Sequence, residues 1–90
     1  MEIRLSTAGA WKLEAPQMKW QGEEPELHVS AQFAGEELRA HEDESADDGT
    51  FRLVYLSFEA TGFPSMHAAK AAAPEFAKTV LARMSEMIDE

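Results

Sequence analysis

The 90-residue sequence contains no cysteine. This absence excludes disulfide bonds, thiolate metal sites and cysteine nucleophiles, and it suits a reducing compartment. The sequence also lacks any apolar run that approaches the ~18 residues of a membrane span. It begins with the alternation Met-Glu-Ile-Arg-Leu-Ser rather than with the apolar core of a signal peptide. We therefore expect a soluble cytoplasmic protein that does not associate with a membrane.

Basic residues are scarce as well. Lys and Arg total 8 against 17 Asp and Glu, which gives a formal net charge of -9. The excess is confined to one segment, because residues 23–48 hold ten acids and a single base, Arg39, whereas the charges cancel over the rest of the chain. No basic stripe is present to contact phosphates, so direct nucleic-acid binding is disfavoured. A basic protein partner is favoured instead.

Motifs for catalysis and for metal or phosphate binding are missing too. No serine has a Gly-x-Ser-x-Gly context, and neither His-Glu-x-x-His nor a phosphate-binding glycine-rich loop occurs. A calcium loop needs an oxygen ligand at its third position and Gly at its sixth; placing Gly49 sixth puts Ala46 third, which fails. We expect no cofactor and no enzymatic activity.

Hydrophobic residues make up 44% of the chain, as in folded proteins, and its length suits a single domain over residues 1–90. The segment 50–61 is the most apolar. Its large side chains fall on both alternating faces, with Leu53 and Tyr55 on one and Val54 and Phe58 on the other. This pattern predicts a strand inside a sheet that is covered on both faces.

Shorter alternations predict further strands at residues 2–6 and 26–34. Residues 11–21 form either one strand interrupted at Pro16 or two short strands, and we expect them at a sheet edge because Pro16 cannot donate to a strand ladder. After Gly35 the apolar positions change parity. This change favours a hairpin whose return strand covers 38–42, and the alternative is a bulge in one long strand.

From Met66 onward the composition is helical, since it is rich in Ala and free of Gly, and Ser65 is placed to cap the helix. Pro74 either kinks one helix or opens a second one. We therefore predict an α+β domain: an antiparallel meander of about four strands with a C-terminal helix, kinked or split at Pro74, on one face. The other face would then need Trp11 and Trp20, a partner chain or a second copy to cover it.

The candidate partner-binding residues are acids of the predicted hairpin turn, of the end of its return strand and of the loop that follows: Glu36, Glu37, Glu42, Asp43, Glu44, Asp47 and Asp48. The leading hypothesis is a non-enzymatic interaction protein. Through these carboxylates, which would imitate phosphates, it would bind and block a basic, nucleic-acid-handling protein. Inhibitors and immunity proteins encoded by phages or plasmids share this general character. The alternative is a small structural or assembly subunit that forms a homodimer through the uncovered sheet face.

His28 and His41 form a further candidate. With a hairpin turn near Gly35, both would lie on its polar face, with Ser30 opposite His41 and His28 near Asp43. Two imidazoles and a carboxylate are a conceivable transition-metal site. A surface histidine pair is the simpler interpretation, so we assign no metal.

Overall fold

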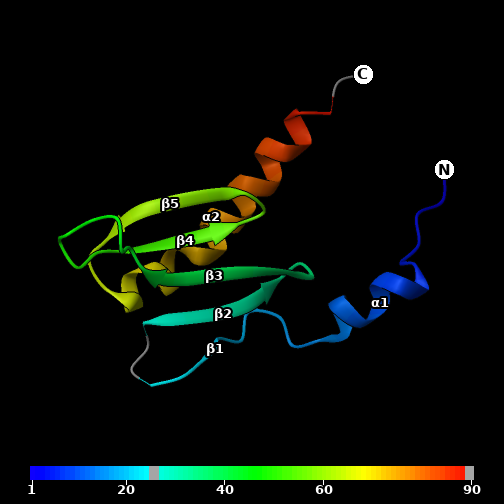
Figure 1. Cartoon of the computed structure of the whole chain (residues 1–90). Helices are drawn as coiled ribbons and strands as arrows, with labels where there is room; N and C mark the ends of the chain where they lie inside the picture. Colours follow the sequence, from blue (N-terminus) through cyan, green and yellow to red (C-terminus); the bar gives the residue numbers. More distant parts are fainter. Residues whose placement is uncertain (25–26, 89–90) are drawn as a thin grey trace.

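A computed structural model describes residues 1–24 and 27–88. Within them, the strands form one antiparallel sheet in chain order, β1-β2-β3-β4-β5, and α2 packs across one face (Figure 1). The elements are α1 (Thr7–Glu14), β1 (Gln21–Gly22), β2 (His28–Phe33), β3 (Glu36–Glu42), β4 (Phe51–Tyr55), β5 (Phe58–Phe63) and α2 (Met66–Glu86). The predicted α+β meander with a C-terminal helix is confirmed, with five strands instead of about four.

Two tight turns set the sheet register. The first is Ala34–Gly35, where φ is +53° and +81°, and the second is Leu56–Ser57, where φ is +48° and +71°. Two consecutive residues with positive φ are typical of two-residue hairpin turns. The predicted hairpin at Gly35 is therefore confirmed over the bulge, although its return strand begins at Glu36. The predicted start of the preceding strand, Glu26, lies outside the described residues.

The prediction that residues 50–61 form one strand with two apolar faces is wrong. The turn at Leu56–Ser57 divides the segment, and Tyr55 pairs directly with Phe58 across it. Paired residues share a face, so both rings belong to the face under α2. Val54 is left as the single large apolar residue that β4 places on the opposite face, where its neighbours are Arg39 and Glu59. That open face is therefore mainly polar.

The predicted N-terminal strands are also wrong. Residues 1–6 have no regular secondary structure, and residues 7–14, which include Trp11, are the helix α1. The Ser6 hydroxyl caps this helix by accepting from the Gly9 amide at 3.1 Å. Ala, Lys, Leu and Glu favour a helix once such a cap is present, and this preference outweighs a short alternation.

Helix α1 buries none of its residues, and Trp11 remains 66% exposed. The helix contacts the sheet at the β2–β3 turn. There the Leu13 side chain packs against Gly35, and the Lys12 ammonium lies 3.4 Å from a carboxylate oxygen of Glu36. Beyond Pro16 the chain reaches β1, which is short and lies at the sheet edge, as expected from the proline.

The core lies between α2 and one face of the sheet. Its sheet side comprises Val29, Ala31, Phe33, Leu38, Ala40, Leu53 and Tyr55, and its helix side comprises Met66, Ala69, Ala73, Ala77 and Val80. The helix residues recur at intervals of three or four, and the alanines allow close approach to the strands. Trp20 packs against this core, with its ring centroid 5.9 Å from that of Phe33.

Helix α2 continues through Pro74 and does not split there. Its last turns extend past the sheet, and residues 81–86 are exposed (Figure 1). Met84 and Met87 are therefore exposed, whereas Met66, in the first turn of the helix, is buried. Neither of the described helices has the length and apolar character of a membrane span.

We predict that Tyr55→Phe destabilises the fold by about 0.5–1.5 kcal/mol, because the buried hydroxyl donates to the Phe33 carbonyl at 2.6 Å. Burial, with a smaller contribution from Glu36, raises the Tyr55 pKa above 10.0. The native state therefore favours the neutral phenol, and its contribution is lost as pH rises through the raised pKa. In urea unfolding, wild type should lose stability above about pH 10 more steeply than Tyr55→Phe; equal slopes would contradict this account.

Candidate functional site

The acidic loop between β3 and β4 closes through its backbone. The Asp43 amide donates to the Thr50 carbonyl at 2.8 Å, and the Ala46 amide donates to the Asp43 carbonyl at 3.2 Å. Gly49, at φ +73°, supplies the left-handed conformation that the chain needs to return to the sheet. The sequence Glu-Asp-Glu-Ser-Ala-Asp-Asp-Gly is rich in turn residues, which explains why no strand continues here.

Asp43 organises this loop and is only 6% exposed. Its Oδ1 accepts from the Ser45 hydroxyl at 2.6 Å and from the Ser45 amide at 3.1 Å. The side-chain hydrogen bond from Ser45 is the main cause that lowers the Asp43 pKa; burial opposes it, and the Ser45 amide, Arg52 and His41 add to it. A carboxylate buried in this way holds the loop and is not available to a partner.

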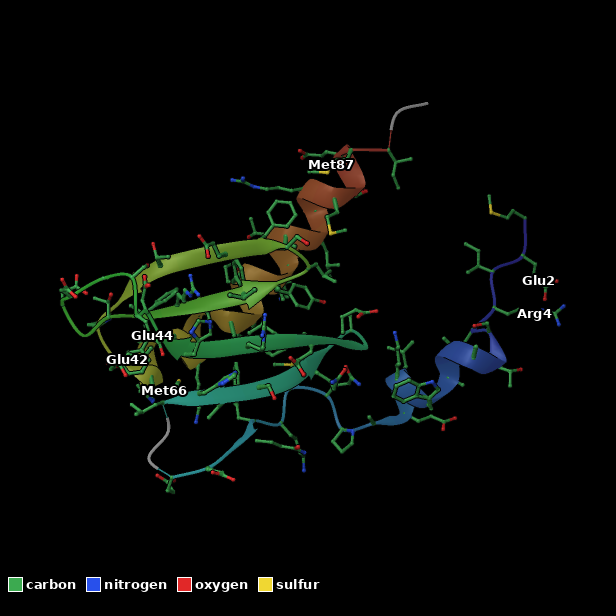
Figure 2. All side chains as sticks on the ribbon, in the orientation of Figure 1. Glu2, Arg4, Glu42, Glu44, Met66 and Met87 are labelled. Carbon is green, nitrogen blue, oxygen red and sulfur yellow. The ribbon has the colours of Figure 1, made fainter. Side chains whose placement is uncertain are left out.

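Four other acids of the loop point outward. Glu42, Glu44, Asp47 and Asp48 are all exposed, and Figure 2 shows Glu42 and Glu44 at this end of the sheet. Asp48 accepts from the Thr50 hydroxyl at 2.8 Å, which orders the end of the loop. The structure thus brings together four of the residues predicted from the sequence.

Glu36 and Glu37 are not part of this group. They begin β3, whereas Glu42 ends it, so the length of the strand separates the two sets by roughly 20 Å. Each also lies beside a cation, at 3.4 Å from Lys12 for Glu36 and at 3.7 Å from Arg39 for Glu37. Their charge is balanced locally and lies at the opposite end of the sheet.

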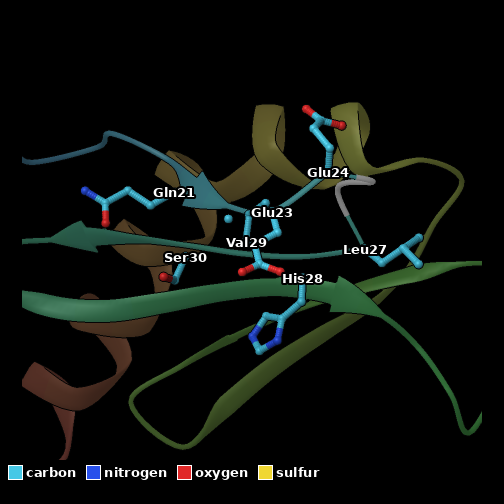
Figure 3. Close-up of a pocket in the computed structure, with 8 residues that line it drawn as sticks. Gln21, Glu23, Glu24, Leu27, His28, Val29 and Ser30 are labelled. Carbon is cyan, nitrogen blue, oxygen red and sulfur yellow. The ribbon is translucent and has the colours of Figure 1, made fainter.

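Two acids that we did not assign to the site lie at the loop end. Glu23 and Glu24 follow β1 and are exposed, and the start of β2 is tied to the end of β3 by a 3.0 Å hydrogen bond from the Glu42 amide to the Leu27 carbonyl. Both residues line a hollow of about 490 Å³ together with Leu27 and His28. Figure 3 shows the Glu23 side chain extending over β2 and the Glu24 side chain pointing away from it. The sequence alone does not show this position, because it follows from the meander order of the strands. We call Glu23, Glu24, Glu42, Glu44, Asp47 and Asp48 the acidic end.

The open face of the sheet carries a polar cluster. His28 pairs directly with His41, which in turn pairs with Arg52 on β4. The imidazole centroids lie 5.5 Å apart, Arg52 Nε donates to His41 Nε2 at 3.3 Å, and Arg52 Nη1 lies 3.3 Å from Glu59 Oε2. Together they line a shallow groove of about 520 Å³ that reaches Glu42 and Glu44.

The histidine register differs from the one we predicted. His28 lies opposite His41 and not near Asp43, and Ser30 lies opposite Arg39, a shift of two residues that keeps both histidines on one face. His41 Nδ1 lies 3.0 Å from the Glu42 carbonyl oxygen, so this nitrogen donates while Nε2 accepts from Arg52. Both ring nitrogens are engaged, and within residues 1–24 and 27–88 no group of three potential His, Asp or Glu ligands is positioned for a metal ion.

Comparison with known proteins adds no assignment. A scan against protein families, a search of curated proteins and a search of solved structures each found no match.

We predict that Asp43→Asn destabilises the fold more at pH 7 than at pH 3. A folded-state pKa below the ordinary 3.8 means that the ionised carboxylate stabilises the fold above about pH 4 and that this contribution disappears as pH falls through the lowered pKa. Urea unfolding at several pH values tests this difference.

Asp47→Asn is the matched control, because it removes the same charge from the same loop without removing a bond to Ser45. An Asp43→Asn penalty that does not shrink in acid would show that the carboxylate charge does not hold the loop.

Proposed function

We propose that this protein is a non-enzymatic interaction protein whose acidic end binds and blocks a basic, nucleic-acid-handling protein. The observation that supports the proposal is the gathering of six exposed carboxylates, from two separate loops, at one end of the sheet. Such a surface attracts a positively charged partner and repels nucleic acid itself.

The ion pairs of the described residues show which carboxylates are neutralised. The ion pairs between described residues are Arg4–Glu2, Lys12–Glu36, Arg39–Glu37 and Arg52–Glu59. None of them includes an acid of the acidic end. Unpaired carboxylates at one end of the sheet contribute to a negative potential that salt screens over ~8 Å at physiological ionic strength, whereas the neutralised pairs on β3 add little.

The proposed binding surface differs from the set of residues that the sequence suggested. Glu36 and Glu37 fall outside it because they are paired and distant, and Asp43 acts on the loop instead of on a partner. Glu23 and Glu24 are added. The partner site is then a rim of carboxylates around the end of the sheet, which a basic groove or a basic loop would fit.

The alternative is a subunit that dimerises through the open sheet face, and it was suggested because we expected that face to be apolar. The open face instead carries polar residues, which include His28, Ser30, Arg39, His41 and Arg52. Burying these groups against a second copy would require a partner for each of them. That the protein is an inhibitor or immunity protein encoded by a phage or plasmid is also a proposal.

We predict that the fourfold variant Glu42→Gln, Glu44→Gln, Asp47→Asn and Asp48→Asn loses its basic partner. With wild type as bait in a lysate of the native host at low salt, the retained proteins should be basic nucleic-acid-binding proteins, released by high salt or by added DNA. The variant should retain them poorly, and for a purified partner its association rate should fall roughly tenfold or more.

The matched control is Glu36→Gln with Glu37→Gln, which removes two negative charges from the other end of β3 and should retain the same proteins as wild type. If the fourfold variant and wild type capture the same proteins with the same salt dependence, the acidic end is not the binding surface.

A further inference from the structure

Strand β5 ends the sheet with an unpaired edge. No strand formed by the described residues pairs with its outer side. Because Tyr55 and Phe58 flank a two-residue turn, they exchange both backbone hydrogen bonds, so the N–H and C=O of Glu59 point outward. An exposed edge of this kind is a template for another strand.

An apolar groove runs beside this edge. It has a volume of about 230 Å³ and lies between β5 and the second half of α2, and its lining comprises Phe58, Glu59, Ala60, Phe76, Thr79, Val80 and Arg83. A strand added to β5 would place every second side chain over this groove. The groove therefore selects a short segment with apolar residues at alternate positions.

The same chain carries such a segment. In residues 2–6, Ile3 and Leu5 alternate with polar residues, and these two side chains are 87% and 55% exposed. The segment has no regular structure, and it is joined through α1 to the β1 edge, which is the sheet edge opposite β5. Figure 2 shows Glu2 and Arg4 standing clear of the sheet.

We propose that two copies of this chain form a dimer in which residues 2–6 of each copy pair with β5 of the other. Ile3 and Leu5 would lie over the groove, and the intervening Arg4 would lie on the open face near Glu59. Arg4 loses little by leaving its present partner Glu2, since both side chains are more than 70% exposed and such pairs contribute little. The exchange is reciprocal, so it closes with twofold symmetry.

The geometry of β5 fits a short added strand. The register between β4 and β5 shifts between the pairs Leu53–Ala60 and Phe51–Phe63, so the regular part of the edge begins at Phe58 and ends near Ala60. This part adjoins the Leu56–Ser57 turn, whereas the acidic end adjoins the β3–β4 loop at the other end of β4. Both acidic ends would therefore stay exposed in the dimer, and its formation does not depend on the proposed function.

The test is analytical ultracentrifugation of the full chain over a range of concentrations. Wild type should dimerise, and Ile3→Glu with Leu5→Glu should raise the dimer dissociation constant by at least about tenfold for each exchanged arm. Because both residues are exposed outside the core, this variant should keep the circular dichroism and urea midpoint of the monomer.

The edge is tested by Glu59→Pro, which removes an outward N–H that no other strand uses, with Glu59→Ala as the matched control for the lost carboxylate. Mixing the arm variant with Glu59→Pro should restore a heterodimer, since one intact arm can meet one intact edge. If Glu59→Pro does not fold, Ala60→Lys, which places a charge over the groove, serves in its place.

A wild-type chain that stays monomeric at NMR concentrations would overturn the proposal, even if the edge later binds a segment of another protein. A dimer that survives the arm variant, or a mixture of the two variants that forms no heterodimer, would overturn it equally.

Discussion

The arrangement of this protein depends on two tight turns that fix the register of its sheet. Ala34–Gly35 aligns β2 with β3, and Leu56–Ser57 aligns β4 with β5. A slip of one residue in either hairpin would move a row of side chains to the opposite face. Leu56 and Ser57 have positive φ although neither is Gly or Asn, which costs about 1–2 kcal/mol for each residue. The packing of Tyr55 and Phe58 in the core must offset this cost.

The register places apolar and polar side chains in different parts of the sheet. All the large apolar side chains of β2 and β3 lie under α2, and the cluster of His28, His41 and Arg52 lies on the open face. The turns occupy one end of the sheet, and the acidic β3–β4 loop occupies the other. The exposed carboxylates of the acidic end lie at one end of the sheet because the meander brings the residues that follow β1 and the β3–β4 loop to that same end.

Much of the fold could be predicted from residue patterns. The hairpin at Gly35 was evident from the change of apolar parity, and the C-terminal helix was evident from its composition and from Ser65 as its cap. The turn at Leu56–Ser57 could not be predicted, because neither residue favours the positive φ that a two-residue hairpin turn needs and the segment continues to alternate. Residues 2–6 alternate like a strand, yet pairing requires a neighbour that the single chain does not provide.

The candidate site was harder to predict than the fold. Glu36 and Glu42 are close in sequence, but they begin and end the same strand, so sequence proximity overstated their proximity in space. Glu23 and Glu24 are distant from the loop in sequence and near it in the meander. The ion pairs could not be predicted either. Lys12, which neutralises Glu36, lies on a helix, whereas the alternation of apolar residues had predicted a strand there.

The most direct test of this account is the register of the β2–β3 hairpin, measured by NMR. His28 and His41 form a non-hydrogen-bonded pair, and the α-carbons of such a pair lie about 4.5 Å apart. The Hα atoms of His28 and His41 should therefore show a strong nuclear Overhauser effect. We expect this contact. A strong contact between the Hα atoms of His28 and Asp43 would contradict this account, because the turn and the place of the acidic loop would both shift along the strands.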